Sequence, residues 1–164
     1  MKECSMKPKT PELSLVQQNY IETIYYLCSA HGHAHVKNIA DKLNIKMASV
    51  TEAMQGLKSL GIVNYAARQN ITLTAPGSRI AEELSLRHST LASFYHEILG
   101  CSINKANEIA CRVEHVIDPE YMERLAGFVK FIKENMRLPD GSNPVLEFKK
   151  KYENSACRSK SCRR

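Results

Sequence analysis

The sequence predicts a mainly α-helical protein in which an N-terminal winged helix-turn-helix precedes a second helical domain. Two short amphipathic runs with a tight turn between them fill residues 36–60, and two short extended runs follow Gly61. Longer segments with helical periodicity then continue to about residue 135. The 164 residues leave room for two small domains, and a hydrophobic content of 43% is typical of a folded chain rather than a disordered one.

The first predicted helix runs from Leu13 to about Ser29. Apolar residues recur there at steps of three and four, which is the pattern of an amphipathic helix: Leu15, Ile21, Ile24, Tyr25 and Cys28. Residues 1–11 contain Pro8 and Pro11 among polar residues, so we expect a flexible N-terminal arm.

The helix-turn-helix is predicted from two apolar stripes and a glycine. The stripes are Val36, Ile39, Ala40 and Leu43, and then Val50, Met54, Leu57 and Leu60, on either side of a turn at 44–47. Gly61 has the usual position of glycine after a helix, and the runs 62–66 and 71–74 predict a β-hairpin, the wing.

The second domain is predicted to consist of three helices. Thr74 can cap a long helix that contains an early Pro76 and ends before Gly100. The next helix is expected from about Asn104 to Val116, and the last from the Asp118-Pro119 cap to near Asn135, with a loop over 139–144. The predicted division is an arm at 1–11, the DNA-binding domain at 12–75, the helical domain at 76–148 and a disordered tail at 149–164.

The charge and the apolar runs limit the partners of the chain. The net charge is +6, and the tail from residue 149 carries seven Lys or Arg against the single acid Glu153, which suits a polyanion. No stretch approaches the roughly 20 apolar residues of a membrane span, so we expect a cytoplasmic protein without a membrane partner. The six cysteines lack the spacing of a disulfide framework, so we interpret them as reduced thiols.

The second helix of a helix-turn-helix normally lies in the major groove of DNA, and the wing contacts phosphates. Small and hydroxyl side chains at its start allow close approach, and basic residues neutralise the backbone. The predicted DNA-contacting residues are Lys37, Lys46, Ala48, Ser49, Thr51, Glu52, Gln55 and Arg68. The alternative is a winged helix that binds another protein.

The run 110–115 contains a thiol, a carboxylate and an imidazole at i, i+3 and i+4. On a helix, Cys111, Glu114 and His115 would share one face and could converge on one cation. A buried thiol, a surface acid and a hydrogen-bonded histidine are the alternative interpretation. Three alternating histidines, His31, His33 and His35, are expected in a loop between helices, exposed to solvent or, alternatively, as a surface metal trap.

From about Leu15 to Leu146 the sequence resembles the DtxR/MntR family of metal-dependent transcriptional repressors. The matching segments are Tyr20-Ile21-Glu22-Thr23-Ile24-Tyr25, Ile39-Ala40, Leu73-Thr74-Ala75-Pro76-Gly77, Arg87-His88, Ile103-Asn104-Lys105, Ala110-Cys111-Arg112-Val113-Glu114-His115-Val116 and Gly141-Ser142-Asn143-Pro144. The resemblance implies homodimers that bind double-stranded DNA. The apolar faces of the helices over 104–116 and 118–135 would form the dimer interface, and the SH3-like domain of longer members has no counterpart.

The resemblance also implies a set of metal ligands. The implied ligands are Cys111, Glu114, His115, His88 and Glu22. Asn19 stands where the family has Met or Asp, and it would offer a side-chain carbonyl or leave another group to complete the site. Ala92 and Asn107 replace a Glu and a His of the iron-sensing branch. We therefore expect the second metal site of the family to be rearranged or absent.

The thiol of Cys111 favours Fe²⁺ over Mn²⁺, because softer ligands suit later transition metals, with Mn²⁺ or Zn²⁺ as alternatives. The expected function is an iron-responsive repressor of metal-homeostasis genes, a dimer on a palindromic operator without a small-molecule substrate. A metal-independent winged-helix regulator remains the alternative. The sequence has no HExxH motif, glycine-rich phosphate loop or nucleophile elbow, so we do not expect an enzyme.

Overall fold

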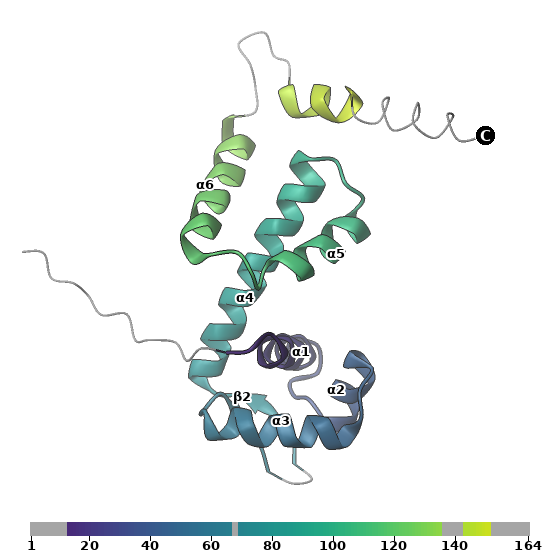
Figure 1. Ribbon diagram of the computed structural model, residues 1–164, viewed down its shortest axis with the longest axis vertical. Helices are drawn as coiled ribbons and strands as arrows, with labels where there is room; N and C mark the ends of the chain where they lie inside the picture. Colours follow the sequence, from purple (N-terminus) through teal and green to yellow (C-terminus); the bar gives the residue numbers. More distant parts are fainter. Residues whose placement is uncertain (1–12, 67–68, 136–142, 152–164) are drawn as a thin grey trace, which may run out of the picture. The chain divides into compact units, whose positions relative to one another are not determined.

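The structure is a computed structural model that describes residues 13–66, 69–135 and 143–151 (Figure 1). The chain divides within helix α4 (Ala75–Ser93) into two compact units, Met1–Ser85 and Leu86–Arg164. Each unit has its own buried apolar residues. No helix in these ranges is long and apolar enough to cross a membrane.

Helix α1 (Leu15–His31) opens the N-terminal unit close to its predicted bounds. Ser14 and Gln17 form a capping box, in which each side chain accepts a hydrogen bond from the other residue's backbone amide. Gly32 ends the helix with φ at 78°, a left-handed conformation that glycine adopts without steric cost. The side chains that α1 buries form the centre of this unit: Tyr20, Ile21, Thr23, Ile24 and Leu27.

The predicted helix-turn-helix is confirmed as α2 (Val36–Leu43) and α3 (Met47–Ser59). Asn44 ends α2 in the left-handed region, with φ at 54°, and thus turns the chain toward α3. Ile39, Val50, Met54 and Leu57 are fully buried, so the two helices pack through the predicted stripes.

The wing is an antiparallel pair of short strands, β1 (Val63–Asn64) and β2 (Thr72–Leu73), in which Val63 pairs with Leu73. Both strands lie within the extended runs that the sequence predicts. Ala34 adds a third strand-like contact, because it forms an antiparallel bridge with Ile71. The segment between α1 and α2 is the predicted loop, and within it Ala34 pairs with the sheet residue Ile71.

Helix α4 begins where the sequence predicts. The hydroxyl of Thr74 accepts a hydrogen bond from the Gly77 amide at 3.1 Å and donates one to the Gly61 carbonyl at 2.6 Å. Gly77 is buried against the backbone of Ile62, which leaves no space for a larger residue. The helix continues as the π-helical turn η1 (Phe94–Ile98) and stops before Gly100, whose φ is 76°.

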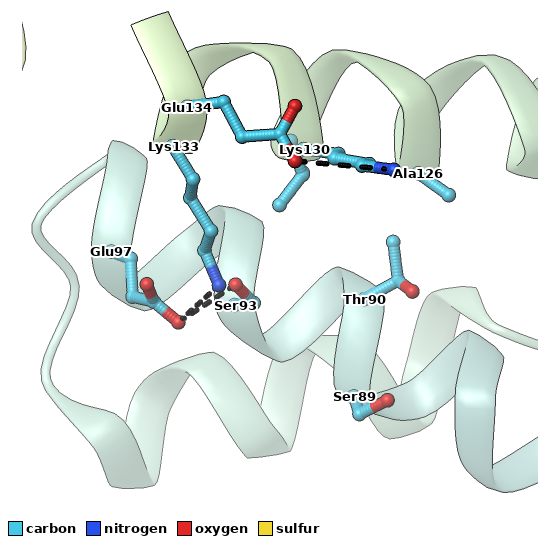
Figure 2. Close-up of a pocket in the computed structure, with 9 residues that line it drawn as sticks. Ser89, Thr90, Ser93, Glu97, Ala126, Lys130, Lys133 and Glu134 are labelled. Atoms are coloured by element: carbon cyan, nitrogen blue, oxygen red, sulfur yellow. Dashed lines mark hydrogen bonds and ion pairs between the residues drawn. The ribbon is translucent and has the colours of Figure 1, made fainter. Parts of the chain in front are cut away.

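The C-terminal unit also contains α5 (Ile103–Val113) and α6 (Pro119–Asn135). Leu91, Ala110 and Met122 belong to one buried cluster, whereas Ile98 and Val129 belong to another. An open groove with a volume of about 490 Å³ separates Ser89, Thr90 and Ser93 of α4 from α6 (Figure 2). Lys133 of α6 closes one end by an ion pair with Glu97 at 2.9 Å, which holds the pKa of the Glu97 carboxyl below its usual value.

Two predictions for this unit are wrong in detail. Helix α5 ends at Val113 instead of Val116, so Glu114 and His115 lie beyond its last helical residue. Residues 144–151 are helical, although the sequence predicted a loop through 144 and a disordered tail from 149. Asn143 starts this helix by accepting hydrogen bonds from the amides of Val145 and Leu146, at 3.0 and 3.2 Å. Most of the predicted tail lies outside the described residues.

Candidate metal centre and DNA-binding surface

Three predicted ligands meet in the C-terminal unit: His88 from α4, Cys111 from α5 and Glu114 just after α5. Their ligand atoms, an imidazole nitrogen, a sulfur and a carboxylate oxygen, all lie within 4.8 Å of one another. The closest pair is His88 Nδ1 and Glu114 Oε2, at 2.8 Å, and the Cys111 Sγ lies 3.7 Å from the same nitrogen. This donor set fits a divalent transition-metal ion.

Glu114 is the central residue of the cluster. Its exposed fraction is 1%, and an unpaired carboxylate would be costly at such a depth. Each of its oxygens faces a different histidine, because Oε2 lies against His88 and Oε1 lies 3.4 Å from His115 Nε2. One carboxylate can therefore bridge two imidazoles, or two cations that those imidazoles bind.

His115 lies near Glu114 but is not in the same group of candidate ligands as Cys111. The prediction placed Cys111, Glu114 and His115 on one helical face, but the helix ends at Val113 and the last of these residues lies in the turn that follows. His88 takes the third place beside Cys111 and Glu114, and His115 contacts the cluster through Glu114. The assignment of His115 as a metal ligand stays a prediction.

Ala92 and Asn107, two of the three departures from the family pattern, have different environments. Ala92 is buried with Leu91 and Ala110 in an apolar cluster and offers no ligand atom. Asn107 contributes instead an amide oxygen 3.3 Å from His88 Nε2, so that nitrogen donates to the amide while Nδ1 points toward Glu114. Asn107 thus orients the His88 ring, as groups behind metal ligands commonly do.

Asn19 and Glu22 lie on α1, in the N-terminal unit. Asn19 is exposed and Glu22 is half-buried. Their assignment as metal ligands remains a prediction.

Most of the predicted DNA-contacting residues are exposed to solvent. Lys37 is exposed on α2, Lys46 caps the start of α3, and exposed residues follow it on α3, namely Ala48, Ser49, Glu52 and Gln55. Thr51 is half-buried, and its hydroxyl donates to the Met47 carbonyl at 3.1 Å, which is a contact within the helix. Arg68 lies outside the described residues.

The other two thiols of the described residues, Cys28 and Cys101, do not belong to the cluster. Burial raises the pKa of Cys28, which favours its neutral form, and its Sγ lies 3.7 Å from the Ile71 carbonyl oxygen. Cys101 is half-buried and forms no disulfide with another cysteine of the described ranges. Cys4, Cys157 and Cys162 lie outside those ranges.

A winged helix-turn-helix joined to a helical unit with a thiolate, imidazole and carboxylate cluster defines a class of protein, the metal-responsive DNA-binding regulator. Comparison with known families agrees with this class. The N-terminal DNA-binding domain of the iron dependent repressors matches residues 12–71, and their metal binding and dimerisation domain matches residues 74–142. The chain belongs to this family, the DtxR/MntR family, whose members are transcriptional regulators and not enzymes.

Individual relatives show how much of the chain is shared. An uncharacterized HTH-type transcriptional regulator of Methanocaldococcus jannaschii is 34% identical over 120 residues, which cover 73% of this chain and 96% of the relative. The regulator MntR of Shouchella clausii is 30% identical over 118 residues, or 72% of this chain and 82% of the relative. The crystal structure of T. acidophilum IdeR aligns with a TM-score of 0.64 at 25% identity, covering 80% of this chain but 60% of the IdeR chain.

Proposed function

We propose that the protein is an iron-responsive repressor of metal-homeostasis genes that acts as a homodimer on a palindromic operator. The observation that carries the proposal is the cluster of His88, Cys111 and Glu114, with ligand atoms within 4.8 Å of one another. It lies in the region that matches the family's metal binding and dimerisation domain.

The choice of Fe²⁺ depends on the chemistry of the ligands. A thiolate beside an imidazole and a carboxylate is a softer set than nitrogen and oxygen ligands alone, and it disfavours Mn²⁺ relative to Fe²⁺, Co²⁺, Ni²⁺ or Zn²⁺. Affinity alone does not select the metal in a cell, so availability decides between these ions. Manganese and zinc are the alternatives that the experiment below must distinguish from iron.

The resemblance to the family adds Glu22 and Asn19 as ligands from α1. Ligands from both the DNA-binding and the metal-binding regions would couple the bound ion to the orientation of the recognition helix. A metal shifts such an equilibrium only by the difference between its affinities for the two states. Glu22→Gln is therefore expected to weaken the metal response while leaving DNA binding without metal unchanged.

In the proposed complex, α3 reads the major groove. Ser49, Glu52 and Gln55 are exposed there and offer hydrogen-bonding groups to base edges. Lys37 and Lys46, together with Arg68, supply positive charge to the phosphates. Two such helices in a dimer would contact successive major grooves, which is the reason for proposing a palindromic operator.

Fluorescence anisotropy under anaerobic conditions tests the proposal. A labelled promoter fragment with a palindromic site is titrated with protein at fixed salt, in the presence of Fe²⁺, Mn²⁺, Zn²⁺ or a chelator, since salt alone changes such affinities strongly. We expect Fe²⁺ to lower the Kd at least about tenfold relative to the chelator. A larger effect of Mn²⁺ or Zn²⁺ would reassign the metal, whereas equal binding with chelator would indicate a metal-independent regulator.

A further inference from the structure

A second pair of metal-binding side chains lies in the N-terminal unit, just before α2. The Nε2 atoms of His33 and His35 are 3.2 Å apart. Their rings meet edge to face, with centroids separated by 4.8 Å and planes inclined by 79°. Neither histidine has a place in the regulatory cluster described above.

The backbone explains why the two imidazoles face each other. Ala34, the residue between them, donates a hydrogen bond to the Ile71 carbonyl at 2.9 Å and accepts one from the Ile71 amide at 2.8 Å. Its side chain is 1% exposed. Because side chains alternate across an extended strand, residues on either side of a buried Ala34 project together toward the opposite, outer face.

We propose that His33 and His35 form a chelating site for a divalent transition-metal ion, separate from the Cys111 cluster. Two nitrogens 3.2 Å apart, each about 2.05 Å from a common ion, subtend an angle of about 103° at that ion. This angle lies between the octahedral and tetrahedral values, so the separation of the two nitrogens suits a shared transition-metal ion. Both rings would carry their proton on Nδ1 and present an unprotonated Nε2 to the metal.

The chemistry of the pair indicates which ions it would bind. Imidazole suits Zn²⁺, Ni²⁺ and Cu²⁺, and affinity for a nitrogen site rises from Ni²⁺ to Cu²⁺. Within the described ranges, neither histidine belongs to a group of three or more candidate ligands. Water would therefore complete the coordination, and the site should be weaker than one that includes the Cys111 thiol.

His31 provides a matched control from the same segment. It is exposed like His35, but it is the last residue of α1, and Gly32 reverses the chain after it. It therefore lies outside the segment around the Ala34 bridge that holds the other two rings. His96 is a second exposed histidine, in η1, and its Nδ1 lies 2.8 Å from the Cys101 carbonyl.

Equilibrium dialysis of the full chain against Ni²⁺ tests the proposed site without measuring DNA binding. The double variant His33→Ala/His35→Ala is expected to bind one Ni²⁺ fewer per protomer than wild type, and the control His31→Ala/His96→Ala to bind as many as wild type. His33→Ala alone should weaken this site at least about tenfold, because chelation is lost. His33→Gln/His35→Gln replaces the alanine variant if circular dichroism shows that the latter is unfolded.

Binding of the same number of Ni²⁺ ions by the His33/His35 variant and by wild type would overturn the proposal. An equal loss in the His31/His96 control would overturn it as well, because the effect would then follow from any surface histidine. Ring resonances provide a second measurement, since paramagnetic Ni²⁺ should broaden those of His33 and His35 before that of His31. Broadening of His31 first would contradict the assignment.

Discussion

At the scale of single residues, Glu114 has the clearest role. Its carboxylate is buried, and its two oxygens face His88 and His115 at 2.8 and 3.4 Å. The negative charge of Glu114 would bind a cation in the cluster, whereas the size of its side chain fills a buried position. Substitutions that remove the charge of Glu114 but keep the size of its side chain therefore test its role.

Glu114→Gln and His115→Ala are each expected to abolish metal-stimulated DNA binding and to leave the fold largely intact. Glutamine keeps the size of Glu114 but offers one neutral oxygen ligand in place of a carboxylate. The Kd for operator DNA with metal should rise to the value measured with chelator. Glu108→Gln is the control, since Glu108 is exposed on α5 and pairs with Lys105. A full metal response in either test variant would show that the site is assigned wrongly.

Asn107 is expected to act on metal affinity through His88. Removing the amide oxygen 3.3 Å from His88 Nε2 frees the ring to rotate, and the loss of such supporting groups typically weakens metal binding by about 10–100-fold. Asn107→Ala should therefore shift the metal titration to higher concentration by about tenfold or more, with unchanged DNA affinity at saturating metal. Asn104→Ala, also exposed on α5, should not shift it. An unshifted titration for Asn107→Ala would contradict this positioning role.

At the scale of elements, the starts of helices were easier to predict than their ends. Thr74 and Pro119 predict helix starts correctly because capping and the first-turn proline are local chemistry. The end of α5 has no glycine, so the periodic pattern suggested that it continued to Val116. Asn143 and Pro144 carry the same cap-and-proline signal as Asp118 and Pro119, but we interpreted them as part of a loop.

The periodic pattern of the sequence does not predict contacts between distant segments. The bridge from Ala34 to Ile71 and the hydrogen bond from His88 to Asn107 join residues that no local periodicity relates. The resemblance to the family supplied His88 as a ligand, but it gave no partner for Asn107. Such pairings depend on tertiary packing, which helix and strand propensities do not encode.

Gly77 links α4 to the wing, and its replacement is expected to destabilise the N-terminal unit. Glycine to alanine in a helix normally stabilises by up to about 1 kcal/mol, but a Cβ on Gly77 would overlap the Ile62 carbonyl. Overpacking typically costs about 1–3 kcal/mol, so Gly77→Ala should lower the urea midpoint. Gly56→Ala in α3 is the control and should raise it, since no atom lies within 4 Å of the added Cβ. An unchanged midpoint for Gly77→Ala would show that α4 shifts freely on the wing.

At the scale of the whole molecule, the remaining question is how two chains associate. Large apolar side chains are exposed on the helices that we predicted to form the dimer interface. Tyr121, Phe128 and Phe131 on α6 are 59%, 47% and 60% exposed, and Ile103 on α5 is 52% exposed. A group of exposed aromatic residues is typical of protein interfaces, where such residues are enriched.

Phe131→Glu is expected to convert the dimer into monomers and to weaken binding to a two-half-site operator. A carboxylate buried without a partner in an apolar interface costs about 3 kcal/mol or more, which corresponds to about a hundredfold increase in the dimer dissociation constant. Sedimentation velocity over a range of protein concentrations measures this shift. Val16→Glu adds the same charge at a similarly exposed apolar residue of α1 and should leave the dimer intact. A Phe131→Glu protein that still sediments as a dimer would place the interface on another surface. A monomeric variant that binds the operator as tightly as wild type would show that DNA recognition does not require the dimer.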